Sequence, residues 1–233
     1  MGYNYFLEMP NRLTSESLKG IKTMANPEGK SEFVNLWPTL FMSVLLPGHE
    51  QANGLLSSLV MQQNAEQNQM TTNYLEQNIF SLEHPAIIWL RQSCEHGIKE
   101  YSSRAGLEKT PEYSLQGWPN VNFKGDYHNL HNHPHSWLSG TYYLHVPSQE
   151  KAETYREDLN PAEISFFDPR ASANMTAIRN DGQFDPEYRR QPNAGELFLW
   201  PSFLYHFVHP NLVDEPRLSI SFNVILHNKS KYL

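Results

Sequence analysis

Three histidines and one arginine stand at spacings that suit metal and anion binding. His131 and His133 are separated by one residue, His206 lies far downstream, and Arg217 follows eleven residues after His206. Imidazole nitrogens bind divalent transition metals, and a guanidinium group can hold a planar carboxylate through two parallel hydrogen bonds. We therefore interpret these four residues as an iron site with a carboxylate anchor.

The alternation of side chains in extended segments supports this grouping. In a strand, residues two apart leave the same face, so His131 and His133 can reach one metal, with His206 completing the site from another strand. The segment that begins at Arg217 alternates in the same way. One face would carry its polar side chains and line an interior, whereas the other would carry its apolar side chains and meet helices: Arg217, Ser219, Ser221 and Asn223 against Leu218, Ile220, Phe222 and Val224.

The first half of the chain predicts an arm, a strand and two helices. Residues 1–32 are polar and read as a peripheral arm, and residues 33–117 read as a strand within 34–46 followed by supporting helices. The first helix carries apolar residues on one side: Ala52, Leu55, Leu56, Leu59 and Val60. The second begins near Pro85, since proline suits the first helical turn, and places apolar residues at helical spacing: Ile87, Leu90, Cys94, Ile98 and Tyr101.

The second half is typical of antiparallel β structure, with short apolar or alternating runs between turn residues. The candidate strands are 118–123, 127–133, 138–146, 163–167, 175–179, 196–200, 205–209 and 217–226. Eight short strands after two helices indicate a mainly β protein with N-terminal helices. We expect residues 118–226 to form a double-stranded β-helix core (jelly-roll, cupin-like) with the helices packed on one sheet, and residues 1–233 to form a single domain.

The composition indicates which binding partners and which cellular compartment to expect. The chain has 233 residues with 18 Lys and Arg against 25 Asp and Glu, a formal charge of -7 that disfavours nucleic acid and anionic membranes. The single cysteine, Cys94, cannot form an intramolecular disulfide and fits a reducing compartment. With neither a leader nor an apolar run long enough to cross a bilayer, we expect a cytoplasmic protein without membrane contact. The N-terminal helices are candidates for the interface of a homodimer.

Several motifs in order resemble those of a known enzyme superfamily. They are Trp118-x-Asn120, Asn129-x-His131-x-His133-Pro134, Ser139-Gly-Thr-Tyr-Tyr-Leu144, Asp168-Pro-Arg170, the segment Gly195 to Ser202, His206-x-Val208-x-Pro210-Asn211 and Arg217-x-Ser219-Ile-Ser-Phe-Asn223. Together, over residues 118 to about 224, they resemble the 2-oxoglutarate/Fe(II)-dependent dioxygenases, most closely the uncharacterised "putative 2OG-Fe(II) oxygenase" family. The resemblance implies Fe(II) and 2-oxoglutarate as cofactors. It also implies hydroxylation of an unidentified small-molecule or protein side-chain substrate, with release of succinate and CO2.

The resemblance also implies roles for individual residues. His131 and His206 match the first and the distal metal histidines, and Arg217 matches the arginine that pairs with the far carboxylate of 2-oxoglutarate. Ser219 completes an Arg-x-Ser pair, and Tyr143 matches a tyrosine whose hydroxyl contacts the same carboxylate. Asn129 is a further candidate for a hydrogen bond to the cosubstrate. The sequence holds no Ser-His-Asp or nucleophilic cysteine arrangement, so we expect no catalytic residue beyond the metal ligands.

One position departs from the superfamily pattern, because His133 stands where those enzymes have Asp or Glu. We expect His133 to be the third ligand, although Asp168 or a water could complete the site if His133 turned away. Two other functions stay open: a three-His, cupin-like dioxygenase that uses no 2-oxoglutarate, and a non-catalytic jelly roll that binds a metal or a carboxylate. The ordinary alternatives for the charged residues are an ion pair of Arg217 with Asp214 or Glu215, and a turn closed by Asp168 and Arg170.

Overall fold

The computed structural model describes residues 38–66, 78–150, 152, 159–170 and 185–227. Contacts within the chain separate residues 1–38 from residues 39–233, and the second unit holds all the elements described below. Its helices are α1 (His49–Glu66), a short 3-10 helix η1 (Ile79–Ser81) and α2 (Pro85–Arg104). Its strands are β1 (Met42–Leu45), β2 (Tyr113–Asn122), β3 (His128–His131), β4 (Leu138–His145), β5 (Ile164–Phe167), β6 (Glu187–Arg190), β7 (Glu196–Pro201), β8 (His206–Val208) and β9 (Arg217–Leu226). The unit is mainly β with two α-helices, as the sequence predicts.

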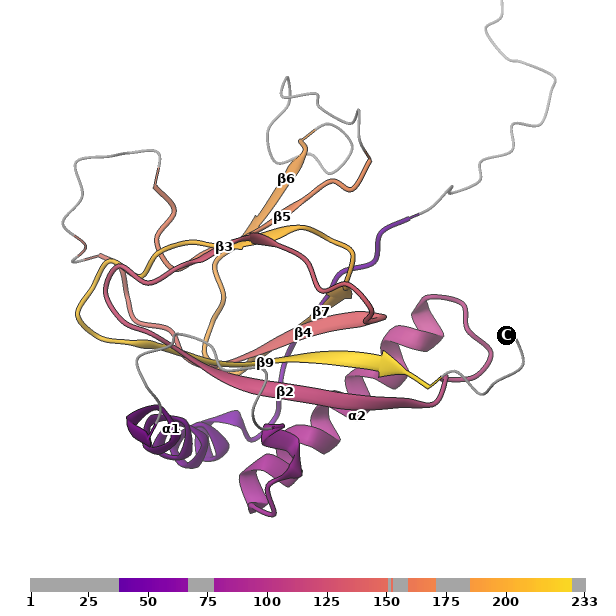
Figure 1. Ribbon diagram of the computed structural model, residues 1–233, viewed down its shortest axis with the longest axis horizontal. Helices are drawn as coiled ribbons and strands as arrows, with labels where there is room; N and C mark the ends of the chain where they lie inside the picture. Colours follow the sequence, from indigo (N-terminus) through magenta and orange to yellow (C-terminus); the bar gives the residue numbers. More distant parts are fainter. Residues whose placement is uncertain (1–37, 67–77, 151, 153–158, 171–184, 228–233) are drawn as a thin grey trace, which may run out of the picture. The chain divides into compact units, whose positions relative to one another are not determined.

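The strands form two antiparallel sheets that pack face to face (Figure 1). The larger sheet has the order β1-β7-β4-β9-β2, and the smaller sheet has the order β3-β8-β5-β6. An apolar cluster between them takes Tyr143, Phe198 and Trp200 from the larger sheet and Ile164, Phe166 and Val208 from the smaller one. The space between the sheets is therefore partly a packed aromatic core.

Both α-helices cover the outer face of the larger sheet (Figure 1). Pro85 occupies the first turn of α2, where its missing N–H costs nothing, and the His84 side chain caps that turn by accepting from the Ala86 N–H. All five apolar residues predicted to line α2 are buried. In α1 the residues that face the sheet are Ala52, Leu56 and Val60, four apart, whereas Leu55 is exposed, contrary to the prediction.

The two faces of β9 lie as its alternation predicts. Its apolar side chains belong to the core shared with the helices, together with Leu56 and Leu90. Its polar side chains point between the sheets, where Ser219 and Ser221 contact Asn120 and where Asn223 accepts a hydrogen bond from Ser139. The polar face of β9 therefore carries its residues into the interior that holds the candidate site.

A close approach between strands requires glycine at position 140. A Cβ atom there would meet the ring of Phe222 and would lie 2.7 Å from the backbone oxygen of Phe198. Because a neighbouring backbone oxygen cannot move aside cheaply, β4 can lie between β7 and β9 at this point only without a side chain.

The clearest differences between the predicted and observed strands concern β2, β3 and β6. β2 begins at Tyr113 instead of 118, because its first residues pair with the far end of β9 as far as Leu226. β3 is shorter than 127–133, and its pairing with β8 contains a register shift. β6 was not predicted, because only Tyr188 in Glu-Tyr-Arg-Arg is apolar. The predicted strand 175–179 and the predicted arm 1–32 lie outside the described residues.

Neither α1 nor α2, the two long helices of the described ranges, is apolar enough to span a membrane.

Candidate metal and carboxylate site

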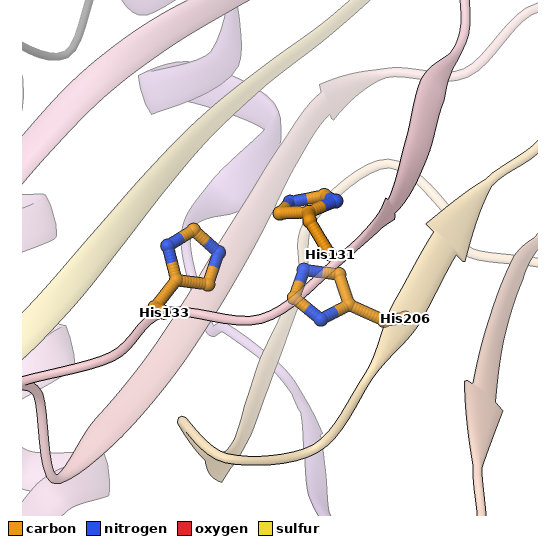
Figure 2. A group of neighbouring side chains, drawn as sticks. All are labelled: His131, His133 and His206. Atoms are coloured by element: carbon orange, nitrogen blue, oxygen red, sulfur yellow. The ribbon is translucent and has the colours of Figure 1, made fainter.

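The smaller sheet brings His131, His133 and His206 together (Figure 2). His131 ends β3 and pairs directly with His206, the first residue of β8, and His133 follows in the loop after β3. One nitrogen from each ring lies within 4.8 Å of the other two. This spread is close to the separation of about 4 Å that two ligands can have when each bonds one metal at about 2.1 Å. Among the described residues, this is the one histidine, cysteine or carboxylate group with such spacing.

Hydrogen bonds orient two of the three rings. The Nδ1 atom of His131 lies 2.5 Å from the Asn129 carbonyl oxygen, and the Nδ1 atom of His206 lies 3.0 Å from the Leu204 carbonyl oxygen. A carbonyl oxygen can only accept, so each Nδ1 carries the proton and each Nε2 keeps its lone pair. Metal-binding histidines typically have this arrangement, because the second hydrogen bond fixes both the tautomer and the ring orientation.

The turn after β7 holds the loop that carries His133. The Ser202 carbonyl accepts from the His133 N–H, the Ser202 hydroxyl donates to the Ser136 carbonyl, and the Ser202 N–H donates to the Trp137 carbonyl. Ser202 is itself buried. Three contacts from Ser202 therefore fix the backbone of the loop that carries His133, although this loop is not part of a strand.

The surroundings keep the imidazoles of His133 and His206 neutral. Burial, with a smaller effect from His131, lowers the pKa of His133 to about 4, and burial lowers the pKa of His206 well below its ordinary value. Aromatic rings supply much of this burial, with Trp118 against His133 and Trp200 against His206. Since a neutral imidazole is the form that binds a metal, the site is ready for a cation at neutral pH.

Arg217, the first residue of β9, is a buried cation. It is 2% exposed, and in the described part of the chain it makes no ion pair. Its Nη2 donates to the Asn122 Oδ1 at 3.0 Å, its Nη1 donates to the Ala162 carbonyl at 3.4 Å, and its Nε has no partner. A buried charge without a counter-ion is costly. The unpartnered Nε and the uncompensated charge therefore fit an anionic ligand.

The ordinary ion pairs considered for Arg217 do not form. Asp214 pairs with Lys124, and the carboxylate of Glu215 lies 2.8 Å from the Nε2 of His145. Burial lowers the pKa of Arg217, and the neighbouring Tyr143 partly opposes this effect.

Tyr143 and Ser219 lie beside Arg217. Both are buried, and they pair directly across β4 and β9, two residues from the arginine. Burial raises the pKa of Tyr143, and the positive charge of Arg217 opposes the rise, so the phenol stays protonated and able to donate. The structure thus brings together Arg217, Ser219 and Tyr143, as the sequence predicts.

The structure does not bring Asn129 to this group. Asn129 is exposed, and its side-chain oxygen accepts from the Leu130 N–H, so its carboxamide completes a local turn instead of reaching Arg217. Asp168 is not available as a substitute ligand, because Arg170 closes a turn on it and lowers the pKa of its carboxyl through hydrogen bonding. The predicted turn with an internal ion pair is confirmed.

Two residues that the sequence analysis did not assign to the site contact it. Asn122 bonds Arg217 directly, and the Nε2 of His128 lies 3.1 Å from the Asn122 Nδ2. The signal was present in the alternation Trp118-x-Asn120-x-Asn122, which places Asn122 on the inner face of β2. The pairing of Asn122 with Arg217 depends on the register of β2 with β9, and that register is not written in any local motif.

Comparison with known proteins points to one family. Residues 116–223 match the family model described as "Putative 2OG-Fe(II) oxygenase". No curated protein is significantly similar to the chain in sequence.

Solved structures show where the fold recurs. A prolyl-4-hydroxylase from Pseudomonas putida is similar with a TM-score of 0.55 and 14% identity, over 81% of this chain and 93% of that one. HygX from Streptomyces hygroscopicus, crystallised with nickel and 2-oxoglutarate, has a TM-score of 0.53 and 12% identity, over 84% and 86%. A Trichoplax adhaerens prolyl hydroxylase, in complex with a peptide of hypoxia inducible factor, has a TM-score of 0.52 and 12% identity, over 79% and 83%. At such low identity these likenesses show the fold.

The matched segment, 116–223, begins within β2 and ends within β9, and it contains the three clustered histidines, Arg217, Ser219 and Tyr143. Over this segment the chain is similar to the 2OG-Fe(II) oxygenase family, the 2-oxoglutarate-dependent dioxygenases whose cofactors are Fe(II) and 2-oxoglutarate.

Proposed function

We propose that the chain is an Fe(II)- and 2-oxoglutarate-dependent oxygenase that hydroxylates its substrate, with its two sheets forming a double-stranded β-helix around the site. His131, His133 and His206 would hold the metal, and Arg217 would hold the far carboxylate of 2-oxoglutarate with help from Ser219 and Tyr143. Two observations carry this proposal: three histidines whose ring nitrogens lie within 4.8 Å of one another, and a buried arginine that makes no ion pair in the described part of the chain.

The residues present fit both cofactors. Two of the imidazoles have their Nε2 lone pairs free, as a divalent metal requires, and Arg217 has an unpartnered Nε and makes no ion pair among the described residues. Fe(II) and 2-oxoglutarate, when bound, supply the oxidation by decarboxylating the 2-oxo acid to succinate and CO2 and placing one oxygen atom on the substrate.

The protein's own contribution is binding and orientation. Arg217 fixes one end of the cosubstrate, so the other end is directed toward the histidines, and the Tyr143 hydroxyl can donate to the same carboxylate. Three neutral imidazoles leave the full charge of the metal uncompensated, and together with Arg217 they favour a dianionic ligand. The aromatic cluster around Trp200 and Phe166 shields one side of the site from water.

The substrate is a small molecule or a protein side chain. A protein substrate is represented among the structures with this fold, since one was solved in complex with a peptide fragment of hypoxia inducible factor. Polar side chains on the inner face of the larger sheet, including Asn120, Ser221 and Asn223, are the groups we propose to hydrogen-bond a polar substrate.

Turnover without a primary substrate tests the proposal. The Fe(II)-loaded chain with 2-oxoglutarate and O2 should release succinate, and Arg217→Lys should raise the KM for 2-oxoglutarate by about tenfold or more, because lysine lacks the planar fork. An unchanged KM in Arg217→Lys would remove Arg217 from the cosubstrate site.

A three-His dioxygenase that needs no 2-oxoglutarate is the second candidate, and the observation that favours it is His133 in place of a carboxylate. In that case Arg217 would hold a carboxylate of the substrate itself. O2 consumption that persists after 2-oxo acids are removed would select this candidate over the first.

A further inference from the structure

A buried line of polar contacts runs from Arg217 through Asn122 to His128. The Arg217 Nη2 donates to the Asn122 Oδ1 at 3.0 Å, and the Asn122 Nδ2 lies 3.1 Å from the His128 Nε2. Asn122 is fully buried as the last residue of β2, and it pairs directly with Arg217, the first residue of β9.

The chemistry of the three groups sets the direction of every bond in this line. A guanidinium only donates, so the oxygen of the Asn122 carboxamide faces Arg217 and its NH2 faces His128. His128 therefore accepts at Nε2, which makes it neutral with its proton on Nδ1. Its surroundings agree, because burial, followed by the charges of Arg217 and the other histidines, lowers the pKa of His128 to about 3.

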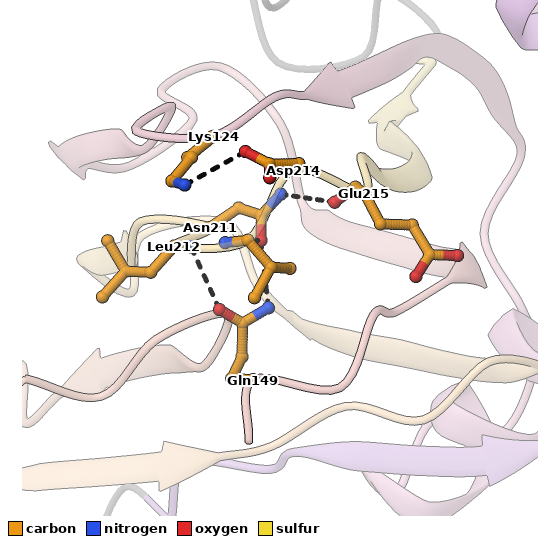
Figure 3. A network of polar contacts seen from close by, with 7 residues as sticks. Lys124, Gln149, Asn211, Leu212, Asp214 and Glu215 are labelled. Atoms are coloured by element: carbon orange, nitrogen blue, oxygen red, sulfur yellow. Dashed lines mark hydrogen bonds and ion pairs between the residues drawn. The ribbon is translucent and has the colours of Figure 1, made fainter. Parts of the chain in front are cut away.

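A second set of contacts, centred on Asn211, holds the backbone next to this line, and Figure 3 shows the contacts of Asn211 with Gln149 and Glu215. The Asn211 Nδ2 donates to the carbonyls of Asn122 and Glu215, at 3.1 and 2.8 Å. Gln149 donates to the Asn211 Oδ1 at 3.0 Å and accepts from the Leu212 N–H at 3.0 Å. Asn211 thus ties the end of β2 to the loop that leads into β9, so Asn122 and Arg217 are held at a fixed separation.

We propose that Asn122 is a positioning residue for the 2-oxoglutarate anchor: held by His128, its uncharged carboxamide orients the Arg217 guanidinium and leaves the arginine's charge for the carboxylate of the cosubstrate. This inference rests on the proposed function. A neutral partner is the essential feature, because a carboxylate at position 122 would form an ion pair with Arg217 and compete with the ligand.

The exchange Asn122→Asp tests the proposal with almost no change in shape. The assay is calorimetric titration of the Ni(II)-loaded full chain with 2-oxoglutarate and, separately, with pyruvate. Pyruvate shares the 2-oxo acid end but lacks the far carboxylate, so it does not need Arg217. In Asn122→Asp the ratio of 2-oxoglutarate affinity to pyruvate affinity should fall by at least about tenfold, while Ni(II) affinity stays unchanged.

Asn53→Asp is the matched control. Asn53 is a half-buried asparagine that, like Asn122, makes two side-chain hydrogen bonds, to the Leu144 carbonyl and from the Tyr142 hydroxyl, but neither reaches Arg217. The Asn53→Asp exchange adds the same negative charge as Asn122→Asp and should leave the ratio of 2-oxoglutarate affinity to pyruvate affinity unchanged. If Asn122→Asp also leaves the ratio unchanged, Asn122 has no positioning role.

The same contact can be tested from its other end if Asn122→Asp does not fold. His128→Gln keeps a hydrogen-bonding group that can hold the Asn122 carboxamide, whereas His128→Leu does not. The affinity ratio should fall in His128→Leu and recover in His128→Gln, and equal ratios in the two variants would overturn the proposal. A wild-type Ni(II) chain that does not bind 2-oxoglutarate would instead refute the proposed function itself.

Discussion

His133 gives the candidate metal site an unusual charge. A carboxylate at this position would leave the site with one positive charge less, whereas a third neutral imidazole leaves the whole charge of the divalent ion in place. The half-buried ring has a lowered pKa, and the three contacts of Ser202 hold the loop that carries it, so we interpret His133 as a built part of the proposed site.

Removal of the His133 imidazole should therefore weaken metal binding strongly. We predict that His133→Ala lowers the affinity for Ni(II) by more than the 10- to 100-fold typical of losing a residue that only supports a ligand. Competition with a chromophoric chelator measures this affinity. His133→Asp should bind Ni(II) clearly more tightly than His133→Ala, because a carboxylate can take the same coordination position.

His135 offers a control from the same loop. It is exposed, lies outside the cluster of three, and has a φ of 69°, which asparagine tolerates better than most residues. His135→Asn should keep the wild-type affinity. Equal losses in His133→Ala and His135→Asn would mean that the loop as a whole, and not the His133 ring, supports the metal.

At the scale of elements, the larger sheet depends on Gly140. The ring of Phe222 and the Phe198 carbonyl occupy the space that a side chain at 140 would need, so β4 must shift if one is added. We predict that Gly140→Ala lowers the free energy of unfolding by about 1–3 kcal/mol, the usual cost of an overpacked core. Urea denaturation measures the change.

Gly54 is the matched glycine for this experiment. It lies in α1, and a Cβ atom there would meet nothing within 4 Å. Because alanine is a better helix former than glycine, Gly54→Ala should raise the free energy of unfolding by up to about 1 kcal/mol. Destabilisation of similar size in both variants would contradict the account of β4.

Much of this architecture follows from local patterns. Pro85 and the apolar residues of α2 predict that helix, and the alternation that begins at Arg217 predicts both faces of β9, because each pattern is decided by burial on one side. Leu55 was wrongly predicted to be buried, because it lies beside the row of residues Ala52, Leu56 and Val60 that packs on the sheet. β6 escaped prediction because Arg189 and Arg190 carry no apolar signal.

In the candidate site too, local spacing predicted some residues, whereas strand pairing decided others. The period-two spacing of His131 and His133 predicted two neighbouring rings on one strand; the rings are neighbours, but His133 lies in the loop after β3. Asn122 and His128 were not predicted, because their contacts arise from strand pairing between distant segments. Asn129 was expected at the cosubstrate, but its side chain accepts a hydrogen bond from the next residue, Leu130. Sequence spacing does not decide whether an asparagine bonds a local or a distant partner.

At the scale of the whole molecule, buried neutral histidines couple folding to pH. Burial lowers the pKa of His128 to about 3 and that of His133 to about 4, whereas an unfolded chain has histidine pKa values near 6.5. Between these values the unfolded chain binds more protons, so acid favours unfolding. This contribution to stability is complete above about pH 6.5 and is lost as the pH falls toward 3.

We therefore predict that the metal-free chain loses stability between pH 7 and pH 5, at up to about 1.4 kcal/mol per pH unit for each such histidine. Urea midpoints at the two pH values measure the loss. His128→Gln should reduce the slope, because glutamine does not titrate. A pH-independent midpoint in the wild type would show that these imidazoles are already charged, or exposed, in the folded state.

The most direct test of the whole account is an anaerobic titration of the metal-free chain with Fe(II) and 2-oxoglutarate, followed by visible absorption. A 2-oxo acid chelated to Fe(II) gives a charge-transfer band, and we predict that the band forms in the wild type, disappears in His206→Ala and needs much more 2-oxoglutarate in Arg217→Ala. Tight Fe(II) binding with no band at any concentration of 2-oxoglutarate would contradict the account and leave the three-histidine site to another chemistry.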